Sequence, residues 1–447
     1  MPHPVRSLPP SGLRALRCVP LKDFLTADPQ VRTIDRPVDL RFEVARELLR
    51  PPEPPVWFRG QKEGGLVGNL WTSRDRVARY FGVEPRALPD LLLEALEHPI
   101  PPEVVPASQA TWSAREGPAD LTHLPIPYFY PEDAGPYLSA AVFSATWKGK
   151  RNLSFHRIWA RGPTGGPVRL VPRHLDRMVR EARKENTELP VSVVLGGPLE
   201  FLLSAAVSTD YATDEMEIAS ALCRKRLGRP LRVVELANGT RVPAEAEIVF
   251  EGRFTLQDEQ EGPFLDILGT YDAVREGPVL ELTKRRSVED PILPVIVGGA
   301  QEHFILMGLP REPMILRAVR AVVPGTKAVR LTEGGAAWLH GVVSIEKRRD
   351  GDGRNAIMAA LSGHASMKRV IVVDHDIDIF DDREVEWALA TRFQADKGLL
   401  TVPHAVGSSL DPSASTDGLT CKWGLDATLP MKTDRRPFTK GRLPPPD

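Results

Sequence analysis

The first third of the chain combines two helical patterns with proline-rich connections. Apolar residues recur at helical spacing over residues 73–80 and 89–97, which predicts two short amphipathic helices. Prolines crowd residues 51–55 and 99–106, where they favour turns or extended connections. We therefore place a domain boundary within residues 106–111.

Strand patterns dominate the middle third. A capping pattern also occurs there, because Asp214 follows Thr213 and has Glu217 three residues later, as in a capping box. Alternating or β-rich runs predict strands over residues 137–147, 153–159, 191–195 and 246–254, and helices are predicted over 199–208 and from 214 to about 226.

The last third alternates between strands and helices, which suggests a parallel α/β layer. The predicted strands are residues 328–332, 341–346 and 369–373, the predicted helices are 354–361 and 384–395, and a basic, proline-rich tail follows over 436–447. The patterns together predict a mixed α/β protein with an N-terminal α/β portion (1–110), a central domain (111–305) and a C-terminal α/β domain (306–447).

Composition narrows the class of protein. A chain of 447 residues is too long for one ordinary core and predicts two or three domains. The formal net charge is −1, from 58 basic and 59 acidic residues, so the basic excess typical of nucleic-acid binders is absent. Cys18, Cys223 and Cys421 form no CxxC pair, and neither a zinc ribbon nor a disulfide framework is expected.

The hydropathy of the chain argues against export or membrane insertion. Residues 1–20 contain no apolar core of the kind that signal peptides carry. No stretch of 18 uninterrupted apolar residues occurs anywhere in the sequence. We expect a cytoplasmic protein without a membrane span.

Polar residues that could carry chemistry first gather in residues 151–157. On a strand, Asn152, Ser154 and His156 share one face, and an amide, a hydroxyl and an imidazole can ligate a metal or hold a phosphate. His174 begins a helical pattern after a proline, and Glu215 lies in the first turn of another helix. Each feature also has a plainer structural explanation: a half-exposed strand, a structural histidine, and a carboxylate that complements a helix dipole.

A second group of candidates is the segment Glu261-Gly262-Pro263-Phe264-Leu265-Asp266. Gly262-Pro263 favours a turn, so Glu261 and Asp266 flank a bend and could project into one cavity. Carboxylates that lie close together raise each other's proton affinity, as a general acid near neutral pH requires. An acidic turn on the protein surface would explain the same residues without any catalytic role.

Taken in order, these segments resemble the UbiD family of prenylated-FMN-dependent decarboxylases. The resemblance runs from about residue 66 to 428, and the first 40 residues add nothing to it. Its motifs are RNLSFHR at 151–157, PRH at 172–174, DE at 214–215, AEIVFEG at 246–252, EGPFLD at 261–266, VVDHDID at 372–378 and VEWALATR at 385–392.

The resemblance implies a cofactor site with metal ions. The family's divalent ion, usually Mn²⁺, would be held by Asn152, His174 and Glu215 and would bridge to the flavin phosphate. A set of hard oxygen ligands with one imidazole suits Mn²⁺ or Mg²⁺. A K⁺ ion would lie near residues 205–207 and Glu215. The implied cofactor contacts are Asn152, Ser154, Arg157, His174, Glu215 and Lys347.

The resemblance also implies the catalytic residues Arg157, Glu261 and Asp266. Arg157 would pair with the substrate carboxylate, and Glu261 or Asp266 would protonate the product after carbon dioxide leaves, with family analogy favouring Asp266. Some members of the family have Glu in place of Asp266. The implied reaction is a reversible, non-oxidative decarboxylation of an α,β-unsaturated or (hetero)aromatic acid.

Substrate choice and partners follow from the same resemblance. A subset of the family shares the pattern EH…PRE, which matches His303 and Arg311 here, and uses these residues to hold a second anionic group, as in furan dicarboxylate or anhydromevalonate phosphate. An ion pair at a domain interface is the alternative. The family further implies a central split β-barrel, a C-terminal domain that mediates dimerisation, and a flavin prenyltransferase that supplies the cofactor.

Two other functions stay open on the sequence. Asp374, Asp376 and Asp378 follow an apolar strand, and alternating aspartates at the carboxyl edge of a sheet could bind Mg²⁺ in a phosphoryl-transfer enzyme. The second alternative is a non-catalytic scaffold, which would not be expected to retain all of the motif residues.

Overall fold

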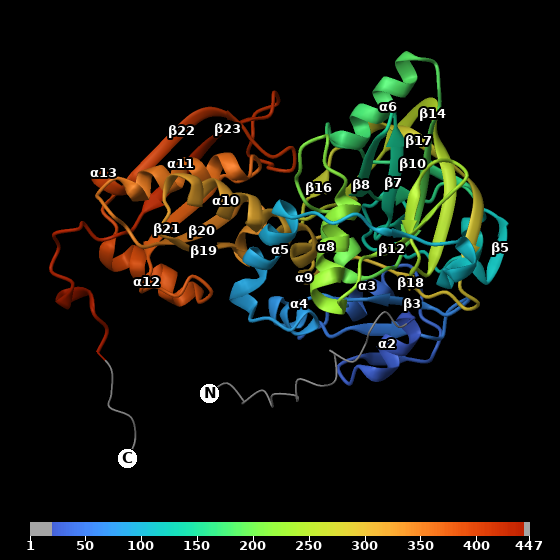
Figure 1. The fold of residues 1–447 in the computed structure, drawn as a ribbon, viewed down its shortest axis with the longest axis horizontal. Helices are drawn as coiled ribbons and strands as arrows, with labels where there is room; N and C mark the ends of the chain where they lie inside the picture. The colour runs from blue at the N-terminus through green and yellow to red at the C-terminus, as the bar shows by residue number, and fades with distance from the viewer. Residues whose placement is uncertain (1–19, 442–447) are drawn as a thin grey trace. The chain divides into compact units, whose positions relative to one another are not determined.

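The computed structural model describes residues 20–441, so the expectations for residues 1–19, including Cys18, and for residues 442–447 lie outside the described part. The chain divides into two compact units, one ending at Pro310 and the other beginning at Arg311. Helices and strands are mixed in both units, as the sequence predicts (Figure 1). Among residues 20–441, no helix is both long and apolar enough to cross a bilayer.

The beginning of the first unit contains a small mixed sheet with the strand order β1-β2-β3-β18. The Ser73 side chain accepts a hydrogen bond from the backbone N–H of Arg76, and this cap explains where α4 begins. The two helices predicted here are both confirmed. The elements are α2 (Leu21–Ala27), β1 (Arg32–Ile34), α3 (Glu43–Leu48), β2 (Val56–Phe58), β3 (Leu66–Gly68), α4 (Arg74–Phe81), α5 (Leu88–Glu97) and β18 (Leu293–Pro294).

An antiparallel sheet forms the centre of the first unit. Its strands follow the order β10-β17-β14-β11-β7-β8, with β5 paired to β17, and this hydrogen-bonded path does not close into a barrel within residues 20–441. The strands are β5 (Arg115–Pro118), β7 (Val142–Trp147), β8 (Lys150–Phe155), β10 (Gly165–Pro167), β11 (Leu189–Leu195), β14 (Ile248–Glu261) and β17 (Arg275–Ser287).

Short elements surround the central sheet. They include the strand pairs β6 (Tyr137–Leu138) with β9 (Ile158–Trp159), and β15 (Phe264–Leu265) with β16 (Tyr271–Asp272). A third small sheet contains β4 (Glu103–Val104), β12 (Arg232–Glu235) and β13 (Arg241–Pro243), and the helices are α6 (His174–Lys184), α7 (Leu199–Ser204), α8 (Glu215–Leu227) and α9 (Gln301–Gly308).

Two local predictions need correction. The helix predicted over 199–208 ends at Ser204, because the chain turns towards the loop that precedes α8. Asp214 is the N-cap of α8 as predicted, but its side chain accepts from Met216 N at 2.9 Å, one residue earlier than in a capping box.

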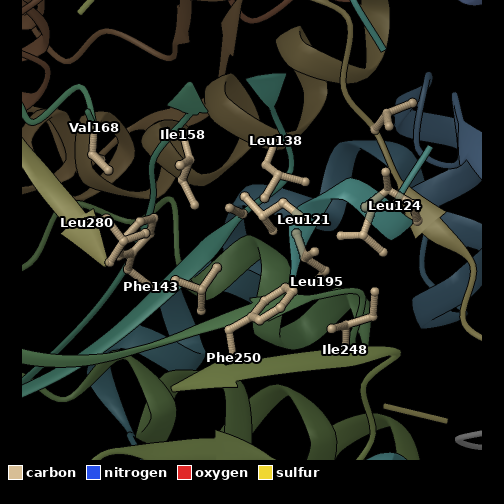
Figure 2. Close-up of a cluster of buried hydrophobic side chains, with 14 of the residues drawn as sticks. Leu121, Leu124, Leu138, Phe143, Ile158, Val168, Leu195, Ile248, Phe250 and Leu280 are labelled. Carbon is tan, nitrogen blue, oxygen red and sulfur yellow. The ribbon is translucent and has the colours of Figure 1, made fainter. Parts of the chain in front are cut away.

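Alternating residues of the central strands build the core of the first unit. Figure 2 shows Phe143 of β7, Leu195 of β11 and Phe250 of β14 within one cluster of buried side chains. The Phe143 ring stacks on Phe254 at a centroid distance of 5.6 Å. Asn152 and Ser154 of β8 lie opposite Ala145 and Phe143 of β7, so the polar residues of the candidate site share one face of the sheet with this core.

The second unit contains a five-stranded sheet with the order β19-β20-β21-β23-β22. The inner pairs, β20 with β21 and β21 with β23, are parallel as predicted, whereas both outer pairs are antiparallel. The layer is therefore mixed rather than purely parallel. The elements are α10 (Glu312–Val322), β19 (Thr326–Leu331), β20 (His340–Ile345), α11 (Asp352–Gly363), β21 (Arg369–Asp374), α12 (Asp382–Arg392), α13 (Ala395–Gly398), β22 (Leu399–Val406) and β23 (Leu419–Asp426).

Candidate active site

The polar face of β8 forms a chain of hydrogen bonds. Ser154 Oγ lies 2.9 Å from Asn152 Oδ1 and 2.8 Å from His156 Nε2. His156 Nδ1 lies 3.0 Å from the carbonyl oxygen of Arg169, so Nδ1 carries the proton and Nε2 is an acceptor. Burial lowers the pKa of His156 to about 4, and the imidazole is therefore neutral at physiological pH.

The three side chains proposed as metal ligands converge at one end of β8. Glu215, the first residue of α8, lies with its Oε1 atom 3.4 Å from Asn152 Nδ2 and 3.7 Å from His174 Nδ1. The second oxygen, Oε2, accepts a hydrogen bond from Leu153 N at 3.0 Å. Thr209, in the loop between α7 and α8, donates to Oε1 at 3.1 Å. The amide, imidazole and carboxylate therefore meet although 63 residues separate Asn152 from Glu215.

Two helices begin at this meeting point. His174 is the first residue of α6, Glu215 is the first residue of α8, and the His174 ring packs edge-on against Tyr211 at 5.3 Å. Helix N-termini carry partial positive charge and unpaired N–H groups, which favour phosphate oxygens. The donor set and the helix ends thus suit an anion together with a hard cation.

Arg157, just beyond β8, gathers three carboxylates. Its Nε and Nη2 atoms donate to the two oxygens of Glu261, both at 2.8 Å, and Nη1 donates to Asp266 Oδ2 at 2.7 Å. Nη2 also lies 3.3 Å from Asp272 Oδ2. Glu261 ends β14 and Asp266 follows β15, so the bend at Gly262-Pro263 directs both carboxylates at one guanidinium. Although burial opposes the charged form, Glu261, Asp266 and Asp272 together raise the pKa of Arg157.

Two members of this cluster are absent from the sequence-based expectations. Asp272 lies in β16, opposite Phe264 in the β15–β16 hairpin, and Arg169 Nε donates to Asp272 Oδ2 at 2.8 Å. The one sequence signal for this arrangement is the turn at Gly269-Thr270, which folds Asp272 back towards Asp266.

Aromatic side chains cover the cluster. The Arg157 guanidinium lies 4.7 Å from the centroid of the Phe264 ring, and Phe264 packs on Tyr137 at 4.5 Å. Burial and the charge of Glu261 raise the pKa of the Tyr137 hydroxyl. Asp133 holds the hairpin by accepting from Leu265 N at 2.9 Å, and burial raises the pKa of Asp133 to about 6.

His303 and Arg311 belong to different units. His303, in α9, lies close enough to Arg157 and Asp266 to feel both charges; burial, helped by Arg157, lowers its pKa, and Asp266 acts in the opposite direction. Arg311 is buried at the start of the second unit, where its guanidinium lies 5.3 Å from the Trp338 ring centroid. In the same unit, Lys347 Nζ lies 3.4 Å from Asp350 Oδ1.

Two of the three aspartates proposed for phosphoryl transfer, Asp374 and Asp376, form ion pairs with arginines. Arg392 lies 3.2 Å from Asp374 Oδ2 and 2.8 Å from Asp376 Oδ2, and Arg435 lies 3.2 Å from Asp374 Oδ2. Asp378 Oδ1 accepts from the N–H of Phe380. Carboxylates paired in this way are structural, and the phosphoryl-transfer alternative is not favoured. No group of three or more His, Cys, Asp or Glu side chains within residues 20–441 is arranged to hold a metal, and the Asn152 site supplies only two such side chains beside its amide.

Comparison with known proteins covers nearly the whole chain. Three family models match, described as the N-terminal domain (residues 23–96), the Rift-related domain (103–301) and the C-terminal domain (304–427) of 3-octaprenyl-4-hydroxybenzoate carboxy-lyase. The anhydromevalonate phosphate decarboxylase of Methanocaldococcus jannaschii is 40% identical over 91% of this chain and 96% of its own length.

Solved structures agree with the family models. The UbiD-class enzyme HmfF from Pelotomaculum thermopropionicum, in complex with FMN, has a TM-score of 0.88 and 35% identity, over 95% of this chain and 96% of that one. An evolved dimeric form of the same enzyme, in complex with prenylated FMN, has a TM-score of 0.84 and 33% identity, over the same shares of the two chains. From its family matches, its relatives and its fold, the chain belongs to the UbiD family of carboxy-lyases.

Proposed function

We propose that this protein is a prenylated-FMN-dependent decarboxylase that acts on a small unsaturated or (hetero)aromatic carboxylic acid carrying a second anionic group. The observation that carries the proposal is the buried cluster of Arg157, Glu261 and Asp266, which combines a carboxylate-binding cation with two groups able to carry a proton. Its relatives include decarboxylases of a phosphorylated acid.

Asn152, His174 and Glu215 supply the ligand types that suit a divalent cation such as Mn²⁺ or Mg²⁺, namely an amide, an imidazole and a carboxylate, and Asn152 Nδ2 and His174 Nδ1 lie 3.4 and 3.7 Å from Glu215 Oε1. Ser154 has one hydroxyl proton and two acceptors, Asn152 Oδ1 and His156 Nε2. A cation bound by Asn152 Oδ1 would require the amide group to turn over, because its nitrogen faces Glu215, and it would leave His156 as the acceptor for Ser154. A K⁺ ion near residues 205–207 is part of the same proposal.

The prenylated flavin, when bound, supplies an electrophilic carbon and an electron sink for the leaving carboxylate. Asn152, Ser154, Arg157, His174 and Glu215 would hold it, with Lys347 as a further phosphate contact. The residues of the chain contribute binding and proton handling around it.

Arg157 would bind the carboxylate of the substrate. A guanidinium has five N–H donors, and the hydrogen bonds found among residues 20–441 use four of them. The remaining hydrogen belongs to Nη1, on the edge next to Asp266. The substrate carboxylate would therefore be held beside Asp266.

Asp266 is the better candidate for the proton donor. Its side chain is 20% exposed, whereas that of Glu261 is 1% exposed, so Asp266 can exchange its proton with water between turnovers. Glu261, with both oxygens on Arg157, would orient the guanidinium and share the proton of the cluster.

The second anionic group would be held by His303 and Arg311. A neutral His303 would contribute a hydrogen bond rather than a charge, and Arg311 would supply the charge. Either residue could contact a phosphate in an anhydromevalonate-phosphate type of substrate or a carboxylate in a furan-dicarboxylate type. We also propose that the protein is a homodimer or higher oligomer formed through its C-terminal domain and receives its cofactor from a flavin prenyltransferase.

The function is tested with protein produced alongside a prenylated-flavin supply and assayed for carbon dioxide release on phosphorylated and dicarboxylic unsaturated acids. Glu261→Gln should lose turnover while retaining flavin absorbance, and activity above about one per cent of the parent would contradict the proton-handling role. Glu259→Gln is the matched control, because Glu259 lies on the same strand with its side chain 40% exposed and pairs only with the exposed Arg161 in the described structure. Absence of activity on every acid tested, in flavin-loaded protein, would reject the function.

A further inference from the structure

Asp272 contacts Nη2 of Arg157, a guanidinium nitrogen on which Glu261 takes only one of the two hydrogens. Nη2 of Arg157 carries two hydrogens; one points to Glu261 Oε2 at 2.8 Å and the other to Asp272 Oδ2 at 3.3 Å. The Asp272 side chain is 2% exposed, so water does not compete for this position. Without Asp272, Nη2 would have a hydrogen available to an incoming carboxylate.

Four donors hold Asp272 in place. Oδ2 accepts from Arg169 Nε at 2.8 Å in addition to Arg157, and Oδ1 accepts from Ala273 N at 3.0 Å and Arg275 Nη2 at 3.3 Å. Burial disfavours the charge, but the hydrogen bond and charge of Arg169 outweigh it and lower the pKa of Asp272. Asp272 is therefore held in place in a setting that favours its ionised form.

Asp266 and Asp272 both accept hydrogen bonds from Arg157, and they lie on the two sides of the β15–β16 hairpin. The β15–β16 pairing places Phe264 opposite Asp272, and the Asp266 N–H donates to the carbonyl of Thr270 at 3.0 Å across the turn. Asp266 occupies one Nη1 hydrogen and Asp272 occupies one Nη2 hydrogen. The hairpin thus decides which guanidinium hydrogen stays open.

On the proposed decarboxylase function, we propose that Asp272 is a positioning residue that blocks Nη2 of Arg157 and so directs the substrate carboxylate to the Nη1 edge beside Asp266. The same residue ties Arg157 to Arg169, whose carbonyl accepts from His156 at 3.0 Å. Asp272 therefore also joins the catalytic cluster to the polar face of β8 that is proposed to hold the cofactor.

The charge-neutral variant Asp272→Asn tests this role. Its single amide oxygen would stay with Arg169, the stronger contact, and Nη2 of Arg157 would become available to the substrate. The carboxylate could then bind across both terminal nitrogens, displaced from Asp266. We expect kcat to fall on the order of 100-fold, as misplacement by about an ångström can cause, while KM does not rise.

Glu276→Gln is the matched control, because Glu276 is an exposed carboxylate four residues further on and its loss changes the net charge by the same amount. The parent enzyme, the variant and the control are compared in the carbon dioxide assay, with flavin absorbance as the check on cofactor loading. An inactive parent rejects the decarboxylase function itself. With an active parent, an unchanged kcat in Asp272→Asn, or a fall that is matched by a rise in KM, overturns the positioning role.

Arg169→Lys covers the case in which Asp272→Asn does not fold. Lysine retains the positive charge beside Asp272 but cannot reproduce the guanidinium Nε donor at 2.8 Å. We again expect kcat to fall without a rise in KM, but by a smaller factor than in Asp272→Asn. A kcat equal to that of the parent in this variant would also overturn the inference.

Discussion

Arg157→Lys tests whether the buried cluster is held by the forked geometry of arginine rather than by its charge alone. Arg157 makes four hydrogen bonds to three carboxylates, and the side chains of Glu261 and Asp272 are 1% and 2% exposed. An ammonium group has three donors at one point and cannot reach both oxygens of Glu261 together with Asp266 and Asp272. At least two charge-assisted bonds are lost, at about 1.5–3 kcal/mol each, so the free energy of unfolding should fall by about 3–5 kcal/mol.

Arg161→Lys is the control for this prediction. Arg161 lies four residues further on and pairs with Glu259 at 2.7 Å, but the two side chains are 53% and 40% exposed, so the same substitution should cost less than about 1 kcal/mol. Urea denaturation followed by circular dichroism gives both values. If Arg157→Lys proves no less stable than Arg161→Lys, the cluster does not hold the hairpin to β8 and the reasoning from its geometry is wrong.

Three further predictions follow from other parts of the molecule. We expect Mn²⁺ to raise the affinity for FMN in calorimetry. Asn152→Ala should abolish this gain, whereas Asp376→Ala should leave it intact; the reverse result would favour the phosphoryl-transfer alternative. Because the folded pKa of His156 is about 4, against an ordinary value of 6.5, the unfolded chain takes up this proton first. The contribution of His156 to the free energy of unfolding is therefore complete above pH 6.5 and falls by about 3 kcal/mol as the pH drops to 4. In urea denaturation at a series of pH values, His156→Gln should not show this loss. Phe250→Ala, in the centre of the buried cluster, should cost about 3–5 kcal/mol, and a loss below about 1 kcal/mol would contradict the packing.

Local patterns predicted much of the fold because several elements carry their own start signals. Ser73 and Asp214 cap the helices that follow them, and the alternation at residues 246–254 belongs to β14. The antiparallel outer strands of the C-terminal sheet were not predicted. Strand direction depends on the connection between distant segments, and β22 presents a largely exposed sequence with little periodicity.

The candidate site shows a similar division. The shared face of Asn152, Ser154 and His156 follows from strand geometry alone, whereas the association of Asn152 with His174 and Glu215 came from resemblance. Asp272 was missed because its partner Arg157 lies 115 residues away in sequence. The turn at Gly269-Thr270 brings Asp272 back towards Asp266, but it does not by itself indicate the contact with Arg157.

On the proposed function, the charges of the cluster would link substrate binding to proton donation. Glu261, Asp266 and Asp272 surround Arg157, and Arg169 and the more exposed Arg275 also pair with Asp272, so three ionised carboxylates would balance the three cations. An anionic substrate entering this buried region would add a further negative charge, at a cost that the low local dielectric makes large. In the proposed reaction, a proton carried by Asp266 or Glu261 would offset the added charge of the substrate carboxylate. The same proton is then in place for transfer to carbon once carbon dioxide has left. On the proposed function, binding of the substrate carboxylate and delivery of the proton would thus be coupled because Arg157, Glu261 and Asp266 belong to one hydrogen-bonded cluster.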